Sequence, residues 1–204
     1  IQGQTGETEI GQGCDTGYAQ MAADAVGVPF GSVHVVSSQD TDVTPYGSGA
    51  YASRQTYVGG FAISKTGRIL REKILNYAHK LTRLPVANLD RVEGKLIRTP
   101  DGEALMSLAE LATEALYSME DSRHITAEAT AQIKSNAYSF GCSYAEVEVD
   151  LKLCKVKVLR LMNVHDCGKL VNPKLAEGQV HGGMSMGLGY ALSGKLPFVV
   201  ITGR

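Results

Sequence analysis

Apolar residues recur at helical spacing in four stretches of the chain, residues 15–26, 63–84, 108–119 and 173–192. The first helix is predicted to begin at Asp15 as its N-cap and to end at Gly27. Pro85 closes the second helix. Ser107, followed by Glu110, matches a capping box before the third. The fourth begins at a proline and contains five glycines, which usually means that something packs closely against such a helix.

Alternation of polar and apolar residues predicts strands between these helices. Residues 32–37 form a short β-branched run, and residues 88–98 with 103–106 are typical of a hairpin. In residues 144–151 the polar positions are acidic and in 153–161 they are basic, which predicts adjacent strands with cross-strand charge pairing. Strands and helices in this order predict an α+β fold with mixed or antiparallel sheets and packed helices.

Composition and charge argue against several classes of protein. The chain has 204 residues, enough for one large domain or two small ones. Lys and Arg number 20 against 21 Asp and Glu, which argues against a nucleic-acid partner. Four cysteines without CxxC spacing indicate a reducing compartment and disfavour an iron–sulfur or zinc site in this chain. No apolar run reaches the ~20 residues of a membrane span, so we expect a soluble, cytoplasmic protein.

The first candidate for chemistry is the triplet Gly11-Gln12-Gly13, between a loop and the first predicted helix. Backbone N–H groups at a helix start lack helical partners and could bind an anion. The Gln12 amide offers both donors and an acceptor, and Gly13 permits close approach. A plain tight turn with a solvated Gln12 is the alternative explanation.

The second candidate lies within residues 49–60, where small residues precede polar ones. The guanidinium of Arg54 is suited to a phosphate-bearing ligand, and the residues around it lead into a helix. An ordinary loop with Arg54 on the surface is the alternative.

Two further segments carry polar side chains near the end of the chain. His165, Asp166 and Cys167 are consecutive, and neighbouring side chains on a strand point to opposite faces, so we expect a strand end and a turn there rather than a metal site. Gln179 near the start of the last helix could present its amide to a buried ligand. The Met and Gly residues around it are typical of packing.

Taken together and in order, these segments resemble the molybdenum-binding large subunit of the xanthine dehydrogenase and aldehyde oxidase family of molybdenum hydroxylases. The resemblance runs from about residue 5 to residue 192. It rests on six motifs in register: Thr8–Gly13 with Thr16, Asp40-Thr41 with Pro45, Ala52–Thr56 with Gly60, Ser139–Gly141 before a strand at 145–149, Asp166–Gly168 with Asn172-Pro173, and Gly178-Gln179 with Gly187–Gly189.

The resemblance implies that nine residues hold a molybdenum–molybdopterin cofactor, with or without the extension of the pterin to a dinucleotide. Three would line the pterin, five would contact the pterin or its phosphate end, and one would reach it from the last helix. In that order they are Gly11, Gln12 and Gly13; Ala52, Ser53, Arg54, Gln55 and Thr56; and Gln179. No side chain of this chain is expected to ligate the metal.

The resemblance also implies an activity. Members of the family hydroxylate an electron-poor carbon with water as the oxygen donor and pass electrons through iron–sulfur clusters to flavin. A xanthine-dehydrogenase-type oxidoreductase of purine catabolism, with iron–sulfur and FAD subunits or domains as partners, is therefore expected. An aldehyde, nicotinate or carbon monoxide substrate, or a catalytically silent ligand-binding or partner-binding module, are the alternatives.

By the same resemblance, residues 1–192 form part of a molybdenum-cofactor-binding domain with two subdomains that divide near residues 86–107. The general-base glutamate of the family would lie beyond this chain, so we expect no catalytic residue here and little activity from this segment alone. Residues 193–204 depart from the family pattern, and Ile1 without a leader is typical of an internal cut. Such a segment is expected to expose apolar surface and to form homo-oligomers.

Overall fold

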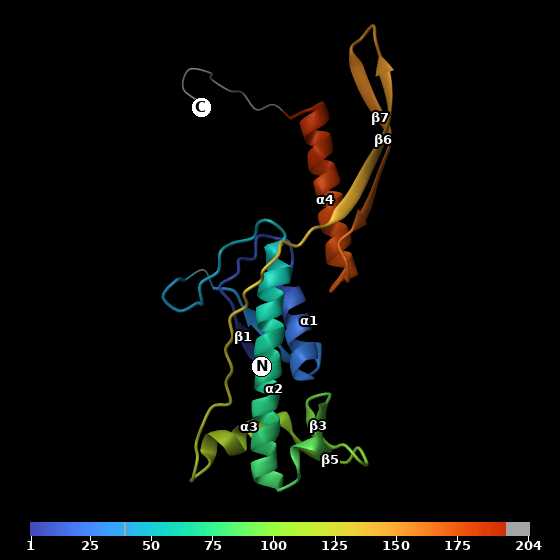
Figure 1. Cartoon of the computed structure of the whole chain (residues 1–204). Coiled ribbons are helices and arrows are strands. Elements are labelled where there is room, and N and C mark those ends of the chain that lie inside the picture. The colour runs from blue at the N-terminus through green and yellow to red at the C-terminus, as the bar shows by residue number, and fades with distance from the viewer. Residues whose placement is uncertain (39, 195–204) are drawn as a thin grey trace. The chain divides into compact units, whose positions relative to one another are not determined.

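The chain folds into two compact units (Figure 1). The computed structural model describes residues 1–38 and 40–194. The first unit comprises Ile1–Ala137 and the second Tyr138–Arg204. The position expected for the boundary between two subdomains of residues 1–192, near residues 86–107, lies inside the first unit, and that subdivision stays a prediction.

The first unit combines helices with short strands, as the sequence predicts. In chain order its elements are β1 (Gln2–Gln4), α1 (Cys14–Val26), η1 (Phe30–Ser32), β2 (His34–Val36), η2 (Gln55–Gly59), α2 (Gly60–Thr82), η3 (Val86–Asn88), β3 (Leu89–Val92), β4 (Lys95–Arg98), β5 (Ala104–Ser107) and α3 (Leu108–Tyr117). Strands β1 and β2 pair in parallel, and β3, β4 and β5 form an antiparallel sheet.

The start of α1 differs from the prediction. Its N-cap is Gly13, in the left-handed region at φ 82°, and not Asp15. Asp15 lies in the first helical turn, where its carboxylate accepts a hydrogen bond from Ser37 Oγ at 2.9 Å. Gly27 ends the helix as predicted, again with a left-handed φ of 81°.

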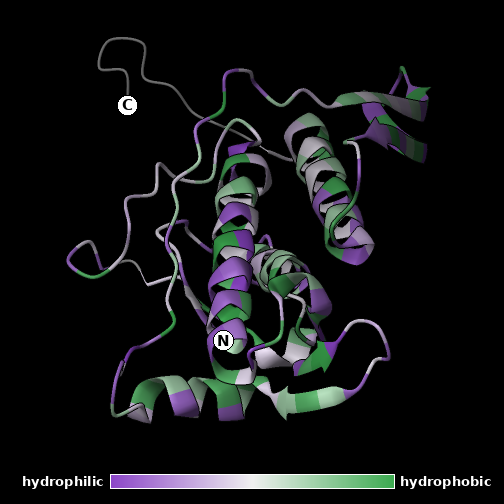
Figure 2. Ribbon diagram, turned by 60° about the horizontal axis from the view of Figure 1, so that its bottom comes forward, coloured by the Kyte–Doolittle hydropathy of each residue, from purple (hydrophilic) through white to green (hydrophobic). Residues whose placement is uncertain are grey.

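The two long helices of the first unit pack closely because glycine permits it. A Cβ on Gly67 of α2 would lie 2.6 Å from the Cβ of Ala25 in α1, so no larger residue fits without movement. Figure 2 shows polar and apolar residues alternating along α2, as its apolar stripe predicts. Where α2 ends, buried apolar side chains join it to the antiparallel sheet and to α3; they include Ile74, Leu75, Tyr77, Ala78, Leu96, Leu111 and Ala115.

The three-stranded sheet contains one turn more than the sequence predicts. Residues 88–98 were expected to be continuous, but Glu93 and Gly94 form a tight turn at positive φ, 49° and 79°, that separates β3 from β4. The capping box is confirmed: Ser107 Oγ accepts a hydrogen bond from the Glu110 N–H, and the Glu110 carboxylate accepts one from the Ser107 N–H at 2.7 Å.

A segment without helix or strand, residues 118–137, follows α3. Lysines of α2 bind it at three points, mostly through its main chain. Lys65 Nζ donates to Thr130 O at 3.2 Å, Lys73 Nζ donates to Thr126 O at 2.7 Å, and Lys80 Nζ pairs with Asp121 at 3.0 Å. These contacts hold the segment against the outer face of α2.

The second unit consists of a long hairpin and one helix. Its described elements are β6 (Phe140–Asp150), β7 (Lys155–Asp166) and α4 (Pro173–Leu192). The predicted opposition of acidic and basic residues is confirmed by the register, which pairs Glu146 with Arg160, Glu148 with Lys157 and Asp150 with Lys155. At the turn Cys154 takes a left-handed φ of 49°, a conformation that favours glycine.

None of the described residues in β6, β7 or α4 is buried, and large apolar side chains such as Val147, Val156 and Leu192 are exposed. An added Cβ at each of the five glycines of α4 would meet no described atom within 4 Å. Within the second unit, no described residue is the close partner expected for this helix. The described helices include none with the length and apolar character needed to cross a bilayer.

Candidate functional site

Two glutamine side chains from distant parts of the first unit meet beside the start of α1. Gln12 Nε2 donates to Gln55 Oε1 at 2.5 Å and to the carbonyl oxygen of Thr8 at 3.0 Å. Gln55 Nε2 donates to the same Thr8 oxygen at 2.6 Å, and the Ile10 N–H donates to Gln12 Oε1 at 2.7 Å. The structure thus joins two of the predicted motifs, 43 residues apart in sequence, through an amide pair.

The backbone N–H groups of the glycine loop are not free, which corrects the expectation from the sequence. Gly11 and Gly13 both donate to Glu9 Oε1, at 2.8 and 3.0 Å, and Asp15 donates to Glu9 Oε2 at 3.2 Å. Burial raises the pKa of Glu9, but these N–H groups outweigh burial and hold that pKa below its ordinary range. An anion of the protein itself therefore occupies the helix start.

Arg54 is also committed inside the protein, where the sequence left it available for a phosphate. Its Nη1 donates to both carboxylate oxygens of Glu7, at 3.0 and 3.2 Å, and to the Gly49 carbonyl at 3.0 Å. The guanidinium also lies 5.7 Å from the centre of the Tyr51 ring. Glu7 is buried, so this ion pair neutralises a charge that would otherwise be isolated from water.

Buried Tyr18 of α1 fixes the backbone of the second motif. Its hydroxyl donates to the carbonyl oxygen of Gln55 at 3.0 Å. Burial, with the nearby charge of Glu7, raises the pKa of Tyr18 well above its ordinary value, so the hydroxyl stays protonated as the donor.

The loop before η2 holds two residues in an unusual backbone conformation. Ala52 and Ser53 have φ of 51° and 55°, in the left-handed region that favours glycine. The chain then forms the π-helical turn η2, which leads into α2. Strained residues beside a π turn are frequent at functional sites. Thr56 lies exposed on this turn, outside the amide pair.

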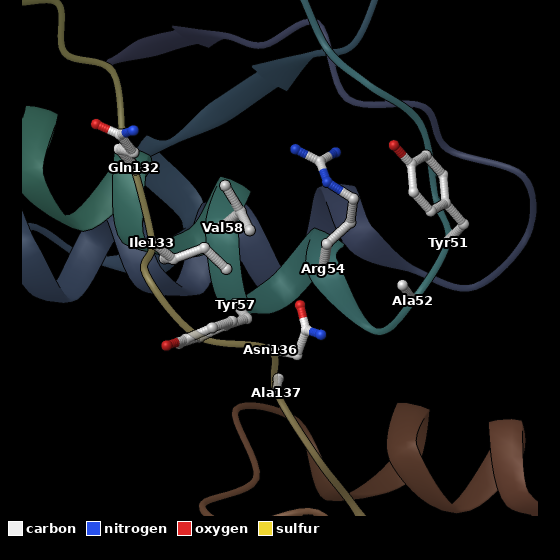
Figure 3. Close-up of a pocket in the computed structure, with 10 residues that line it drawn as sticks. Tyr51, Ala52, Arg54, Tyr57, Val58, Gln132, Ile133, Asn136 and Ala137 are labelled. Carbon is white, nitrogen blue, oxygen red and sulfur yellow. The ribbon is translucent and has the colours of Figure 1, made fainter.

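A pocket of about 310 Å³ opens beside this loop (Figure 3). In Figure 3 the segment that carries Gln132, Ile133 and Asn136 runs past the turn that carries Tyr57 and Val58. Ala52 and Arg54 line one side of the pocket. The opposite wall could not be recognised in the sequence, because residues 131–137 have no periodicity.

Gln179 lies in the second unit, in a cleft of about 660 Å³ between α4 and the hairpin. The cleft is lined mainly by apolar residues, with Ser143, Asn163 and His165 as further polar residues. The strand end and turn predicted at His165–Cys167 are present, because β7 ends at Asp166 and its carboxylate accepts the Gly168 N–H at 2.9 Å.

Ligand atoms of Glu9, Cys14 and Asp15 lie within 4.8 Å of one another, although the sequence predicted no metal ligands. Burial, followed by the charge of Glu9, raises the pKa of the Cys14 thiol to about 12. A protonated thiol is a poor metal ligand, and the Glu9 carboxylate already accepts three N–H groups. The cluster is therefore explained by the loop that it stabilises.

Comparison with known proteins identifies the family. A family model described as a molybdopterin cofactor-binding domain matches residues 1–199. The chain belongs to this family of molybdopterin cofactor-binding domains. It is 47% identical over 194 residues to the xanthine dehydrogenase molybdenum-binding subunit of Escherichia coli, covering 94% of this chain and 26% of that protein. It is 32% identical over 190 residues to the carbon monoxide dehydrogenase large chain of Hydrogenophaga pseudoflava, covering 92% and 24%.

Solved structures confirm the predicted fold. A copper- and molybdenum-containing carbon monoxide dehydrogenase matches with a TM-score of 0.83 at 26% identity, over 96% of this chain and 25% of that one. Quinoline 2-oxidoreductase from Pseudomonas putida 86 matches with a TM-score of 0.81 at 27% identity, over 98% and 26%.

The molybdopterin domain spans about a quarter of the length of the curated relatives that it matches. The family match extends to residue 199, into the segment 193–204 that was expected to be off-pattern. Residues 195–204 of that segment lie outside the described residues.

The amide pair fits a pterin, whose ring carries hydrogen-bond donors and acceptors side by side. The oxygen of Gln12 accepts one of two bonds available to it, and the nitrogen of Gln55 donates one of its two. One acceptor position on each amide oxygen and one donor on Gln55 therefore stay available. The orientation of both amides is fixed by Thr8.

Proposed function

We propose that the amides of Gln12 and Gln55 hold the pterin of the molybdenum cofactor, and that Gln179 of the second unit supplies a third amide. The hydrogen bond between Gln12 and Gln55 carries this proposal, because it brings two motifs together with one donor and two acceptor positions unused. The remaining proposed contacts are Gly11, Gly13, Ala52, Ser53, Arg54 and Thr56.

Each side chain of the pair binds and orients rather than reacts. The Thr8 carbonyl accepts from both amides and so sets the direction of their remaining positions. Gln55 is buried, which shields its hydrogen bonds from competing water. When bound, the cofactor supplies the redox chemistry, and this chain supplies the cradle.

For the whole protein we propose a xanthine-dehydrogenase-type oxidoreductase that hydroxylates a purine or related heterocycle with water as the oxygen donor. Identity of 47% to a xanthine dehydrogenase subunit, against 32% to a carbon monoxide dehydrogenase chain, favours the purine. Iron–sulfur and FAD subunits or domains, a cytoplasmic location and homo-oligomers belong to the same proposal. The general base is expected outside this chain.

Cofactor content tests the site. The protein is produced in a host that makes molybdopterin, and molybdenum and pterin are measured per chain. Gln12→Ala and Gln55→Ala should each lower the content about tenfold, since a lost hydrogen bond or two is worth about 1 kcal/mol apiece. Gln4→Ala is the matched control, because it removes a glutamine amide that donates to Val43 O at 2.8 Å in the same unit.

Unchanged content in both Gln12→Ala and Gln55→Ala would contradict the proposed site. Turnover of the loaded protein with xanthine and with carbon monoxide tests the substrate class separately. Faster turnover of carbon monoxide than of xanthine would contradict the purine assignment.

A further inference from the structure

We propose that Glu9 is the positioning residue of the Gln12 loop, and that it acts as an internal anion which excludes phosphate from the start of α1. The first half of this inference rests on the proposed function of Gln12. The second half is independent of that function and can be measured by itself.

The geometry of Glu9 is that of a bound anion. One carboxylate oxygen accepts the N–H groups of Gly11 and Gly13, and the other accepts the N–H of Asp15. These donors surround the N-terminal end of α1, where the helix carries partial positive charge. A carboxylate placed there satisfies the donors that a phosphate would otherwise bind.

The same contacts determine how Gln12 is presented. Its two neighbours, Gly11 and Gly13, are bound to one carboxylate oxygen and take left-handed φ of 100° and 82°. With the backbone held before and after Gln12, its side chain reaches Gln55. Glu9 thus acts on the cofactor through Gln12 and does not itself contact the cofactor.

The position of Glu9 determines which part of the cofactor can lie at the start of α1. A phosphate at the start of α1 would lie against the Glu9 carboxylate, and like charges at that distance repel. The loop therefore recognises an uncharged, hydrogen-bonding part of a ligand through Gln12, and the phosphate end of the cofactor binds elsewhere.

Two variants test the positioning role. In Glu9→Gln the amide nitrogen replaces one carboxylate oxygen and faces a donor, so the loop loses at least one hydrogen bond. We expect cofactor content per folded chain to fall about tenfold. Glu110→Gln is the control, because Glu110 also accepts an N–H at a helix start, in the capping box of α3. It should leave the content unchanged.

A phosphate titration gives a measurement that would not change if Glu9 had only a structural role. Inorganic phosphate should leave the melting temperature of the cofactor-free wild type unchanged and raise that of Glu9→Ala, whose N–H groups are exposed. If Glu9→Ala does not fold, the backbone amide NMR signals of Gly11 and Gly13 in the wild type are followed instead. Phosphate-dependent shifts of these signals would overturn the inference.

The two proposals fail in different ways. If Gln12→Ala loses cofactor while folded Glu9→Gln keeps it, Glu9 is not a positioning residue and the site stands. If Gln12→Ala and Gln55→Ala both keep the cofactor, the proposed site fails, and with it the positioning role. The phosphate titration still decides whether Glu9 excludes anions.

Discussion

Replacing Arg54 by Met removes the cation that faces Glu7 and leaves a buried carboxylate without a partner. The guanidinium donates to both oxygens of that carboxylate and to the Gly49 carbonyl. The side chains of Arg54 and Glu7 are only 18% and 9% exposed. The perturbation therefore acts on a pair that is largely, though not completely, removed from water.

The magnitude follows from that burial. Breaking a fully buried ion pair costs about 3–5 kcal/mol because the remaining charge is isolated. The partial exposure of Arg54 admits some solvent, so we expect about 2–4 kcal/mol for Arg54→Met. Glu7→Gln combined with Arg54→Met removes both charges and should recover about 2 kcal/mol of this loss.

The assay is urea unfolding of the full chain at pH 7, followed by far-ultraviolet circular dichroism, for wild type, both single variants and the double variant. The double-mutant cycle gives the coupling between the two side chains. Additive losses, or a loss below about 0.5 kcal/mol in Arg54→Met, would show that water screens the pair as it does on a surface.

Four further outcomes follow from the structure. Leu96→Ala, at a fully buried position, should lower the free energy of unfolding by about 2–5 kcal/mol in the same urea assay, and Ser107→Ala should lower it by about 1 kcal/mol through loss of the N-cap. The pKa of Glu9 is lower in the folded protein than in the unfolded chain. The stabilisation that ionised Glu9 provides is therefore complete above the ordinary glutamate pKa and is lost as the pH falls through the pKa of the folded state. Acid should accordingly reduce the difference in the free energy of unfolding between wild type and Glu9→Gln. At pH 8 a thiol reagent should modify the exposed cysteines quickly and Cys14 only on unfolding, as mass spectrometry would show, since burial raises the Cys14 pKa to about 12.

Local patterns predicted much of the fold. The capping box at Ser107 and the proline at the start of α4 place helix starts correctly, because each signal acts within one turn of the chain. The charge alternation along β6 and β7 predicted their pairing, since directly opposite residues of a hairpin lie side by side on the same face. The turn at Glu93 escaped prediction because a non-glycine residue adopts positive φ there.

The site was predicted less completely, for a physical reason. Gln12 and Gln55 stand in recognisable motifs, but their hydrogen bond joins segments that only the tertiary fold brings together. Glu9 could not be found as a capping residue, because it lies four residues before the N-cap Gly13. Gln132 and Asn136 could not be found either, since they lie on an irregular segment whose path is set by contacts with α2.

Because of the lysines of α2, the side chains of the irregular segment 118–137 can change during evolution without loss of its path. Lys65 and Lys73 donate hydrogen bonds to main-chain carbonyl oxygens of residues 118–137, and every amino acid has such a carbonyl. Substitutions between residues 118 and 137 can therefore change the pocket wall without disturbing these two anchors. Anchoring of this kind lets the side chains on one wall of the pocket vary while the path of the segment is kept.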